Sequence, residues 1–254
     1  MNQVHYLPQR DEFSRRADAG QPVNRLLAAM PDTEFRRWAP HLELVDLHLG
    51  QVISEPGSEL EYAYFPLTAI VSLLYVMKDG ESAEIALVGN DGVLGVTLFM
   101  GGNSTTIRAV VQSAGTGYRL PASELVAEVA RGGATLHLLL LYTQALVTQM
   151  TQTAACNRHH TLSQQFSRWL LLSFDRLCGD EMVMTQALVA KMLGVTGEEV
   201  MVPAAALNAA GAIEYRDGRI GLLDRTLLER ASCECYEVVK RECDRLLPSG
   251  PGTH

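Results

Sequence analysis

Short apolar runs separated by turn residues fill the chain from residue 42 to residue 121. They are LELVDLHLG, QVISEPG, YAYFP, AIVSLLYVMKDG, SAEIALVG, AVVQSAG and GYRLP, spaced about 8–12 residues apart. Asp79-Gly80 and Asn90-Asp91-Gly92 are typical hairpin turns. Glu84 alternates with apolar neighbours, which predicts that it lies on the solvent face of a strand. The pattern predicts a compact all-β barrel or sandwich.

A long helix is expected after Gly132-Gly133, because apolar residues then recur at helical spacing. One line of this helix alternates by three and four residues, as in a coiled-coil seam. We therefore predict that this line forms a homodimer interface, with a second line, Leu140, Val147 and Ala154, packed on the barrel. The alternative is that the first line is itself the core-facing stripe. The predicted interface residues are Leu136, Leu139, Thr143, Leu146, Met150 and Thr153.

Residues 184–225 have the pattern of two short helices followed by a hairpin. Gly194 is placed to end the first helix in the left-handed conformation. Thr196 and Glu199 form a T-x-x-E capping box for the second helix, and Asp217-Gly218 is a hairpin turn. Two helices, a glycine turn and a two-stranded wing predict a winged helix-turn-helix, which usually places its second helix in a DNA major groove.

The second helix of this module is poor in the side chains that read DNA. Bases and phosphates are usually met by Arg, Lys, Asn or Gln, yet there is no positive charge between Thr196 and Asn208. Pro203 removes a backbone hydrogen bond inside the helix, at a cost of ~3 kcal/mol. We predict that the DNA-contacting residues are Thr185, Gln186, Thr196, Glu198, Glu199, Arg216 and Arg219.

Composition narrows the class of protein without identifying it. The chain has 254 residues, is 47% apolar and carries a net charge of −8, so attraction to phosphate must come from a local patch. Five cysteines without a spaced framework suit a reducing cytosol. There is no N-terminal signal core and no run long enough to span a bilayer, which predicts a cytoplasmic protein without membrane contact. Because nucleophile elbows, phosphate loops and H-E-x-x-H motifs are missing from the sequence, no enzyme is expected.

The order of these parts resembles the Crp/Fnr family of bacterial transcription regulators. The resemblance covers roughly residues 23–247 and rests on LGQVISEPG, YFPLTAIVSLLYVMKDG, EIALVGNDGVLG, AVVQSAG, CNRHHTLSQQFSRWLLL, TQALVAKMLGV and the RDGRI wing. It implies an α+β protein with an N-terminal cyclic-nucleotide-binding-like β-roll, a long dimerisation helix and a C-terminal winged helix-turn-helix. The implied divisions are a disordered tail (1–21), β-roll sensor domain (22–132), dimerisation helix (133–157), winged helix-turn-helix domain (158–247) and tail (248–254).

The resemblance transfers ligand chemistry unevenly. Cyclic-nucleotide binders of the family hold the ribose with a Gly-Glu pair, but Gly95-Val96 stands in its place here, which argues against cyclic AMP. Arg108-Ala109 resembles the arginine end of the phosphate cassette, although a plain surface arginine is the alternative. Oxygen-sensing relatives carry an N-terminal cysteine cluster, and this chain has no cysteine before Cys156, which argues against an iron–sulfur cluster. The effector stays unknown, and its implied pocket residues are Gly92, Gly95, Arg108 and Ala109.

The reading helix supports two hypotheses of different classes. Family members carry arginines at the positions of Gly197 and Val202, whereas Glu198 matches the family glutamate that accepts a hydrogen bond from cytosine. The first hypothesis is a homodimeric transcription regulator that binds double-stranded DNA and is controlled by an effector in the β-roll. The second is a protein with a degenerate reading helix that acts through protein contacts, for example with RNA polymerase. A third is a nucleotide sensor, for example of cyclic di-GMP.

The candidate metal ligands are cysteines and histidines. Cys156, His159 and His160 fall at i, i+3 and i+4 and could share a helical face as zinc or copper ligands. No C-x-x-C pair completes the set, since Cys233-x-Cys235 has a different spacing. A hinge and a surface helix explain these residues more simply, so no metal site is predicted. A redox switch at Cys233 or Cys235 is the remaining option.

Overall fold

The computed structural model describes residues 23–177, 179–183, 185–216 and 218–247, and the predicted tails at 1–21 and 248–254 lie outside this set. Two short helices, α2 (Arg25–Ala29) and α3 (Asp32–Trp38), and a 3-10 turn, η1 (Ala39–His41), precede the strands. Asn24 caps α2, and its side-chain amide donates to the carbonyls of Pro66 and Gly92. The cap therefore also ties the first helix to the β-roll.

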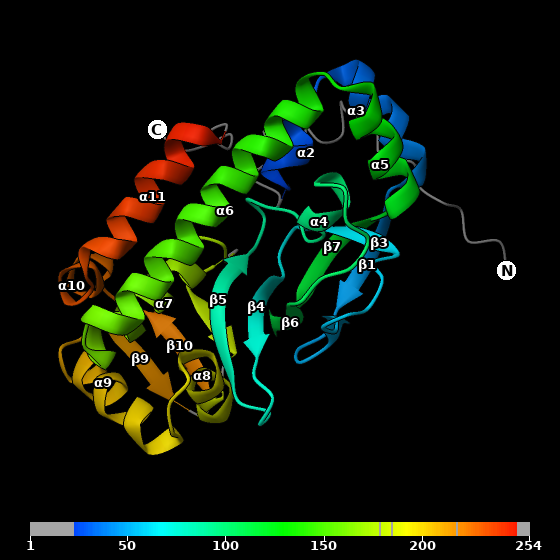
Figure 1. The fold of residues 1–254 in the computed structure, drawn as a ribbon. Coiled ribbons are helices and arrows are strands. Elements are labelled where there is room, and N and C mark those ends of the chain that lie inside the picture. The colour runs from blue at the N-terminus through cyan, green and yellow to red at the C-terminus, as the bar shows by residue number, and fades with distance from the viewer. Residues whose placement is uncertain (1–22, 178, 184, 217, 248–254) are drawn as a thin grey trace, which may run out of the picture.

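Seven strands form two antiparallel sheets, as the alternating apolar runs predict (Figure 1). One sheet has the order β1-β7-β3 and the other the order β2-β6-β4-β5. Apolar side chains fill the space between them, and Trp38 of α3 packs at 5.7 Å on the ring of Phe65. The strands are β1 (Glu43–Leu47), β2 (Val52–Ser54), β3 (Tyr62–Pro66), β4 (Ile70–Val76), β5 (Ser82–Val88), β6 (Arg108–Ser113) and β7 (Gly115–Pro121).

A short helix, α4 (Val96–Phe99), lies between strands β5 and β6 of the roll. Two further helices, α5 (Ala122–Arg131) and α6 (Ala134–His159), follow the last strand, β7. Gly132 and Gly133, with φ of 74° and 98°, make the sharp bend between α5 and α6. The long predicted helix, α6, is confirmed, and it runs across the open side of the roll (Figure 1).

No single helix among the described residues is long and apolar enough to cross a membrane. Only α5 and α6 taken together have the necessary length and composition, and they are bent by 109° relative to each other.

The C-terminal part is a winged helix-turn-helix with one strand more than predicted. The added strand, β8, pairs with β10 and makes a sheet of order β8-β10-β9. The last helix, α11, packs alongside α6 (Figure 1). The elements are α7 (Leu162–Phe174), β8 (Glu181–Val183), α8 (Gln186–Leu193), α9 (Gly197–Ala209), β9 (Ile213–Arg216), β10 (Arg219–Leu222), α10 (Arg225–Ala231) and α11 (Glu234–Leu246).

The winged module docks on the outer face of the β4–β5 sheet. Ile70, Leu74 and Leu87 share one apolar cluster with Trp169 of α7. Gln112, also buried at this boundary, accepts from Ser72 at 2.7 Å and donates to Ser173 of α7 at 3.1 Å. The β-roll and the winged module therefore share a continuous core and a buried hydrogen-bond chain.

The prediction that Glu84 faces solvent is wrong. Its residue is only 8% exposed, because the strand face that would otherwise meet water is covered by α7. Burial raises the pKa of its carboxyl to about 8, although Ser72 and the guanidinium of Arg168 nearby favour the charged form. Strand alternation identified the face correctly, but it could not show that a second module covers that face.

Candidate nucleic-acid interface and ligand pocket

The predicted helix-turn-helix residues mostly hold the module together. The Thr185 hydroxyl caps α8 by accepting from the Leu188 amide, and the Gln186 side chain donates to the Gly197 carbonyl at 2.6 Å. Thr196 and Glu199 form the predicted capping box at the start of α9. Hydrogen bonds from the Thr196 backbone and hydroxyl lower the pKa of Glu199. Three of the predicted DNA contacts, Thr185, Thr196 and Glu199, are therefore occupied as caps.

The outward face of α9 is largely apolar. Val202 is 70% exposed and Met201 is 40% exposed, and both acids of the first turn, Glu198 and Glu199, are exposed. Pro203 is buried inside the helix, and it lacks the amide hydrogen that would reach the carbonyl of Glu199. The helix offers apolar contact and two negative charges, but no cation of its own.

Positive charge near the module comes from the wing. The side chains of Arg216 and Arg219 are 76% and 60% exposed, at the paired ends of β9 and β10. Each has an acidic partner: Arg216 lies 3.2 Å from Glu214, and Arg219 pairs with Glu181. Exposed ion pairs of this kind are weak, so both guanidinium groups stay available to a phosphate.

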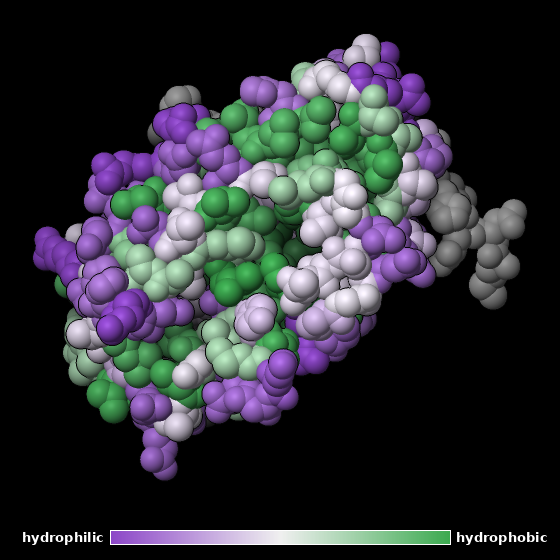
Figure 2. All heavy atoms as spheres, in the orientation of Figure 1, coloured by the Kyte–Doolittle hydropathy of each residue, from purple (hydrophilic) through white to green (hydrophobic). Residues whose placement is uncertain are grey.

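A cavity of about 730 Å³ opens between the β-roll and α6. Figure 2 shows apolar side chains along this helix and around a hollow between it and the strands. Two of the predicted pocket residues, Gly95 at the start of α4 and Ala109 on β6, line the cavity. Other apolar and aromatic lining residues from the roll are Ile53, Leu60, Tyr62, Tyr64, Leu73 and Leu94.

The charges of this cavity are not arranged for a phosphate. Arg108 is absent from the lining and pairs at the rim with Glu55 at 2.7 Å. The lining arginine, Arg119, pairs with Glu43 at 2.7 Å and lies 4.5 Å over the Tyr62 ring. Because the lining also includes acidic residues of the β2–β3 segment, a free phosphate would meet acidic groups beside a single, already paired guanidinium. The site suits an apolar or weakly polar molecule.

Gly92 does not line the cavity. A Cβ at this position would lie 2.5 Å from the Tyr142 hydroxyl oxygen, so α6 packs on the roll at this glycine. The prediction that Gly92 belongs to the effector pocket is therefore wrong. The motif NDG signals a turn, but it cannot reveal a helix that crosses above it.

We expect Gly92→Ala to lower the free energy of unfolding by about 1–3 kcal/mol, because the added methyl overlaps the buried Tyr142 ring. Chemical denaturation of the ligand-free wild type and variant measures the two free energies of unfolding. Gly102→Ala is the matched control, since its Cβ would come no closer than 3.5 Å to other atoms. Equal stabilities of the two variants would contradict the close packing of α6 at Gly92.

The predicted dimer interface on α6 is wrong for half of its residues. Leu139, Leu146 and Thr153 are 2%, 7% and 6% exposed within one chain, so they cannot also meet a partner. Thr143, Leu146 and Met150 also line the cavity. The alternative interpretation of this line, a core-facing stripe, fits the structure.

The apolar residues left uncovered on α6 belong to the second line. Leu140 and Val147 are 49% and 52% exposed, and Ala154 is exposed one heptad further. Together with half-buried residues they complete a seam with spacings of four and three. This revised seam consists of Leu136, Leu140, Thr143, Val147, Met150 and Ala154.

No protein-family model matches the chain, and no curated protein matches it in sequence. Solved structures do match. FixK2 from Bradyrhizobium japonicum is 18% identical, with 76% of this chain aligned to 98% of that chain at a TM-score of 0.62. A Crp/Fnr-family transcriptional regulator from Thermus thermophilus is 21% identical, with 75% and 98% of the two chains aligned at a TM-score of 0.56.

The fold is that of the Crp/Fnr regulators. The cyclic di-GMP-responsive regulator CLP from Xanthomonas campestris also has it: 13% identity, 76% of this chain aligned to 99% of that chain, and a TM-score of 0.56. The Crp/Fnr fold expected from the order of motifs is thus confirmed. Structural similarity at such low sequence identity establishes the fold, and it does not show that this chain binds the ligand of any of these proteins.

Proposed function

We propose that the protein is a homodimeric, DNA-binding transcription regulator controlled by a small molecule in the β-roll cavity. One observation carries this proposal: a single helix, α6, lines the large cavity, exposes the revised heptad seam and leads into the winged helix-turn-helix. Thr143, Val147 and Met150 belong both to the cavity lining and to the revised seam. A ligand that contacts them would favour one arrangement of the two protomers over another.

DNA would be held chiefly by the wing and the start of α9. Arg216 and Arg219 supply the charge, and Glu198 is free to accept from a base edge at the helix N-terminus. Because α9 offers no cation, we expect weak binding at physiological salt and a modest salt dependence. The proposed effector is neutral and mostly apolar, which separates it from cyclic AMP and from cyclic di-GMP.

A second candidate function is supported by the exposed side chains of α9. Val202 and Met201 form an apolar surface where a DNA-reading helix usually places charge. Such a surface fits a protein partner, for which RNA polymerase or a related regulator is the natural choice. In this case the winged module is an adaptor that does not read DNA.

Selection from random duplexes, followed by anisotropy across a salt series, distinguishes the two functions. Enrichment of a two-fold symmetric site supports the regulator. Failure to enrich any site, by protein that light scattering shows to be dimeric, would overturn DNA reading and favour the adaptor.

We expect the double variant Arg216→Ala/Arg219→Ala to reduce the slope of log affinity against log salt by about two, one for each lost phosphate contact. Anisotropy with a non-specific duplex measures the slope. Arg131→Ala is the matched control, because its arginine is 62% exposed on α5, outside the winged module. An unchanged slope in the double variant would show that the wing does not touch phosphate.

A further inference from the structure

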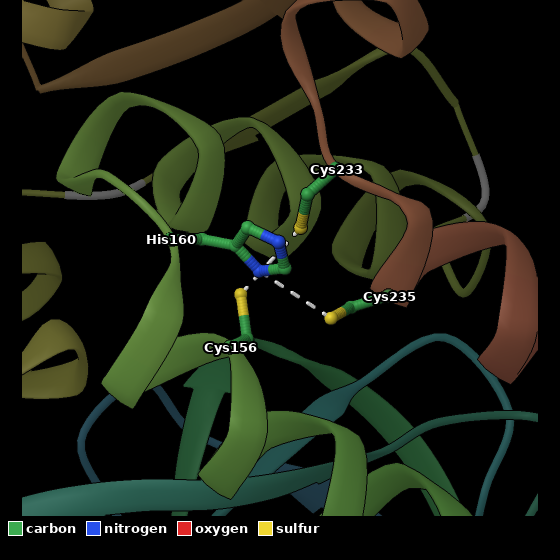
Figure 3. Close-up of side chains that lie close together, drawn as sticks. All are labelled: Cys156, His160, Cys233 and Cys235. Carbon is green, nitrogen blue, oxygen red and sulfur yellow. Dashed lines mark hydrogen bonds between the residues drawn. The ribbon is translucent and has the colours of Figure 1, made fainter.

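Three cysteines and one histidine converge where the end of α6 meets the start of α11 (Figure 3). Cys156 and His160 come from the end of α6, and Cys233 and Cys235 from the start of α11. The Sγ atoms of Cys156 and Cys233 are 3.6 Å apart, and Cys235 Sγ is 3.6 Å from Nδ1 of His160. All four potential ligand atoms lie within 4.8 Å of one another.

These separations are close to the edges of a zinc tetrahedron. With Zn–S bonds of about 2.3 Å and a Zn–N bond of about 2.1 Å, neighbouring ligand atoms lie about 3.5–3.8 Å apart. Two contacts already have this length, and the others need to close by no more than about 1 Å. Three sulfurs and one imidazole nitrogen form the Cys₃His donor set of structural zinc sites.

The surroundings are those of a closed site. Cys156, Cys233 and Cys235 are 0%, 8% and 2% exposed, and they form a cluster separate from the large apolar cores. Nε2 of His160 lies 3.2 Å from the carboxylate of Glu234. A carboxylate on the far nitrogen commonly orients a metal-binding histidine, and here it leaves Nδ1 facing the sulfurs.

A buried cation stands beside the cluster. Arg168 is 4% exposed, and its charge acts on both Cys156 and Cys235. Its Nη1 donates to Thr153, and its Nε has no hydrogen-bond partner among the described residues. Zn²⁺ bound by three thiolates and a neutral imidazole carries one net negative charge, which this guanidinium would offset.

We propose that Cys156, His160, Cys233 and Cys235 bind a structural Zn²⁺ ion. Binding forms three Zn–S bonds and one Zn–N bond, and the three thiol protons are released to solvent. Cys156 and Cys233 are 77 residues apart in the chain, so the ion would fasten the end of the long helix to the winged module. Zinc binding at this site does not depend on DNA binding.

The first test is the metal content of the full-length protein, purified under reducing conditions without chelator. We expect about one zinc per chain in the wild type and less than about a tenth of that in Cys233→Ser/Cys235→Ser. Cys243→Ser and His159→Ala are the matched controls and should keep the ion. Cys243 is half-buried further along α11, His159 is exposed beside His160, and both lie outside the cluster.

Cobalt substitution tests the coordination even if a variant folds poorly. Apo wild-type protein titrated with Co²⁺ should develop the intense visible absorption of tetrahedral thiolate coordination, saturating at one equivalent. A chelator should lower the melting temperature of the wild type and Cys243→Ser alike. Wild-type protein that lacks zinc and gives no such band, holds iron instead, or forms a Cys156–Cys233 disulfide under reducing conditions would overturn the proposal.

Discussion

Leu140→Glu is expected to convert the proposed homodimer into a monomer at micromolar concentration. The substitution places one carboxylate from each protomer into the apolar revised seam of α6, and α6 carries no lysine or arginine between residues 134 and 157 that could pair with it. Burying unpaired charges of this kind should raise the dimer dissociation constant at least about 100-fold, or ~2.7 kcal/mol. Sedimentation velocity over a concentration series measures the constant.

The matched control for this experiment is Val126→Glu on α5. Val126 is 46% exposed, close to the 49% of Leu140, but it lies outside α6. Leu139→Ala separates the two lines of α6: it should cost about 2–5 kcal/mol of folding stability and leave dimerisation intact. A dimer that survives Leu140→Glu and is lost in Val126→Glu would refute the revised seam.

Glu84→Gln is expected to stabilise the protein in a pH-dependent manner. In the unfolded chain the carboxyl ionises near pH 4.5, whereas burial raises its pKa in the folded protein to about 8. Between these values the unfolded state loses a proton that the folded state keeps, so the stability of the wild type falls as the pH rises. The variant has no carboxyl to ionise and avoids this loss.

The difference in stability between Glu84→Gln and the wild type should be small below pH 4.5 and largest above pH 8. We expect about 3–5 kcal/mol there, since one pKa unit corresponds to about 1.4 kcal/mol. Urea denaturation at several pH values measures it. Glu81→Gln is the control, because Glu81 is exposed in the turn between β4 and β5, just before the strand that carries Glu84. A difference that is constant with pH would mean that folding does not raise the pKa of Glu84.

Local patterns predicted the elements well. The T-x-x-E box at Thr196 and Glu199, the left-handed Gly194 and the bend at Gly132-Gly133 are all present, because each depends on residues close in sequence. The order of motifs then indicated the Crp/Fnr fold. The third wing strand was missed because β8 is short and pairs only with β10, which follows much later in the chain.

Sequence patterns gave wrong predictions where the role of a residue depends on an element, distant in sequence, that packs against it. Periodicity found two lines on α6 but could not say which one faces the roll, since both are apolar. The same limit hid the burial of Glu84 and the packing of Tyr142 on Gly92. Cys156 and His160 were candidate metal ligands, but their combination with Cys233 and Cys235 was not predicted, because a Cys-x₃-His pair and a Cys-x-Cys pair each carry little signal until α11 folds against α6.

The shared core of the β-roll and the winged module makes the protomer one cooperative unit. Cutting the chain in the turn between α6 and α7 would leave Ile70, Leu74 and Leu87 open to water on one fragment and Trp169 on the other. We therefore expect that neither fragment folds stably alone, and that each would aggregate through its exposed apolar surface. A substitution at this boundary, in the β-roll or in the winged module, would therefore change the stability of both parts.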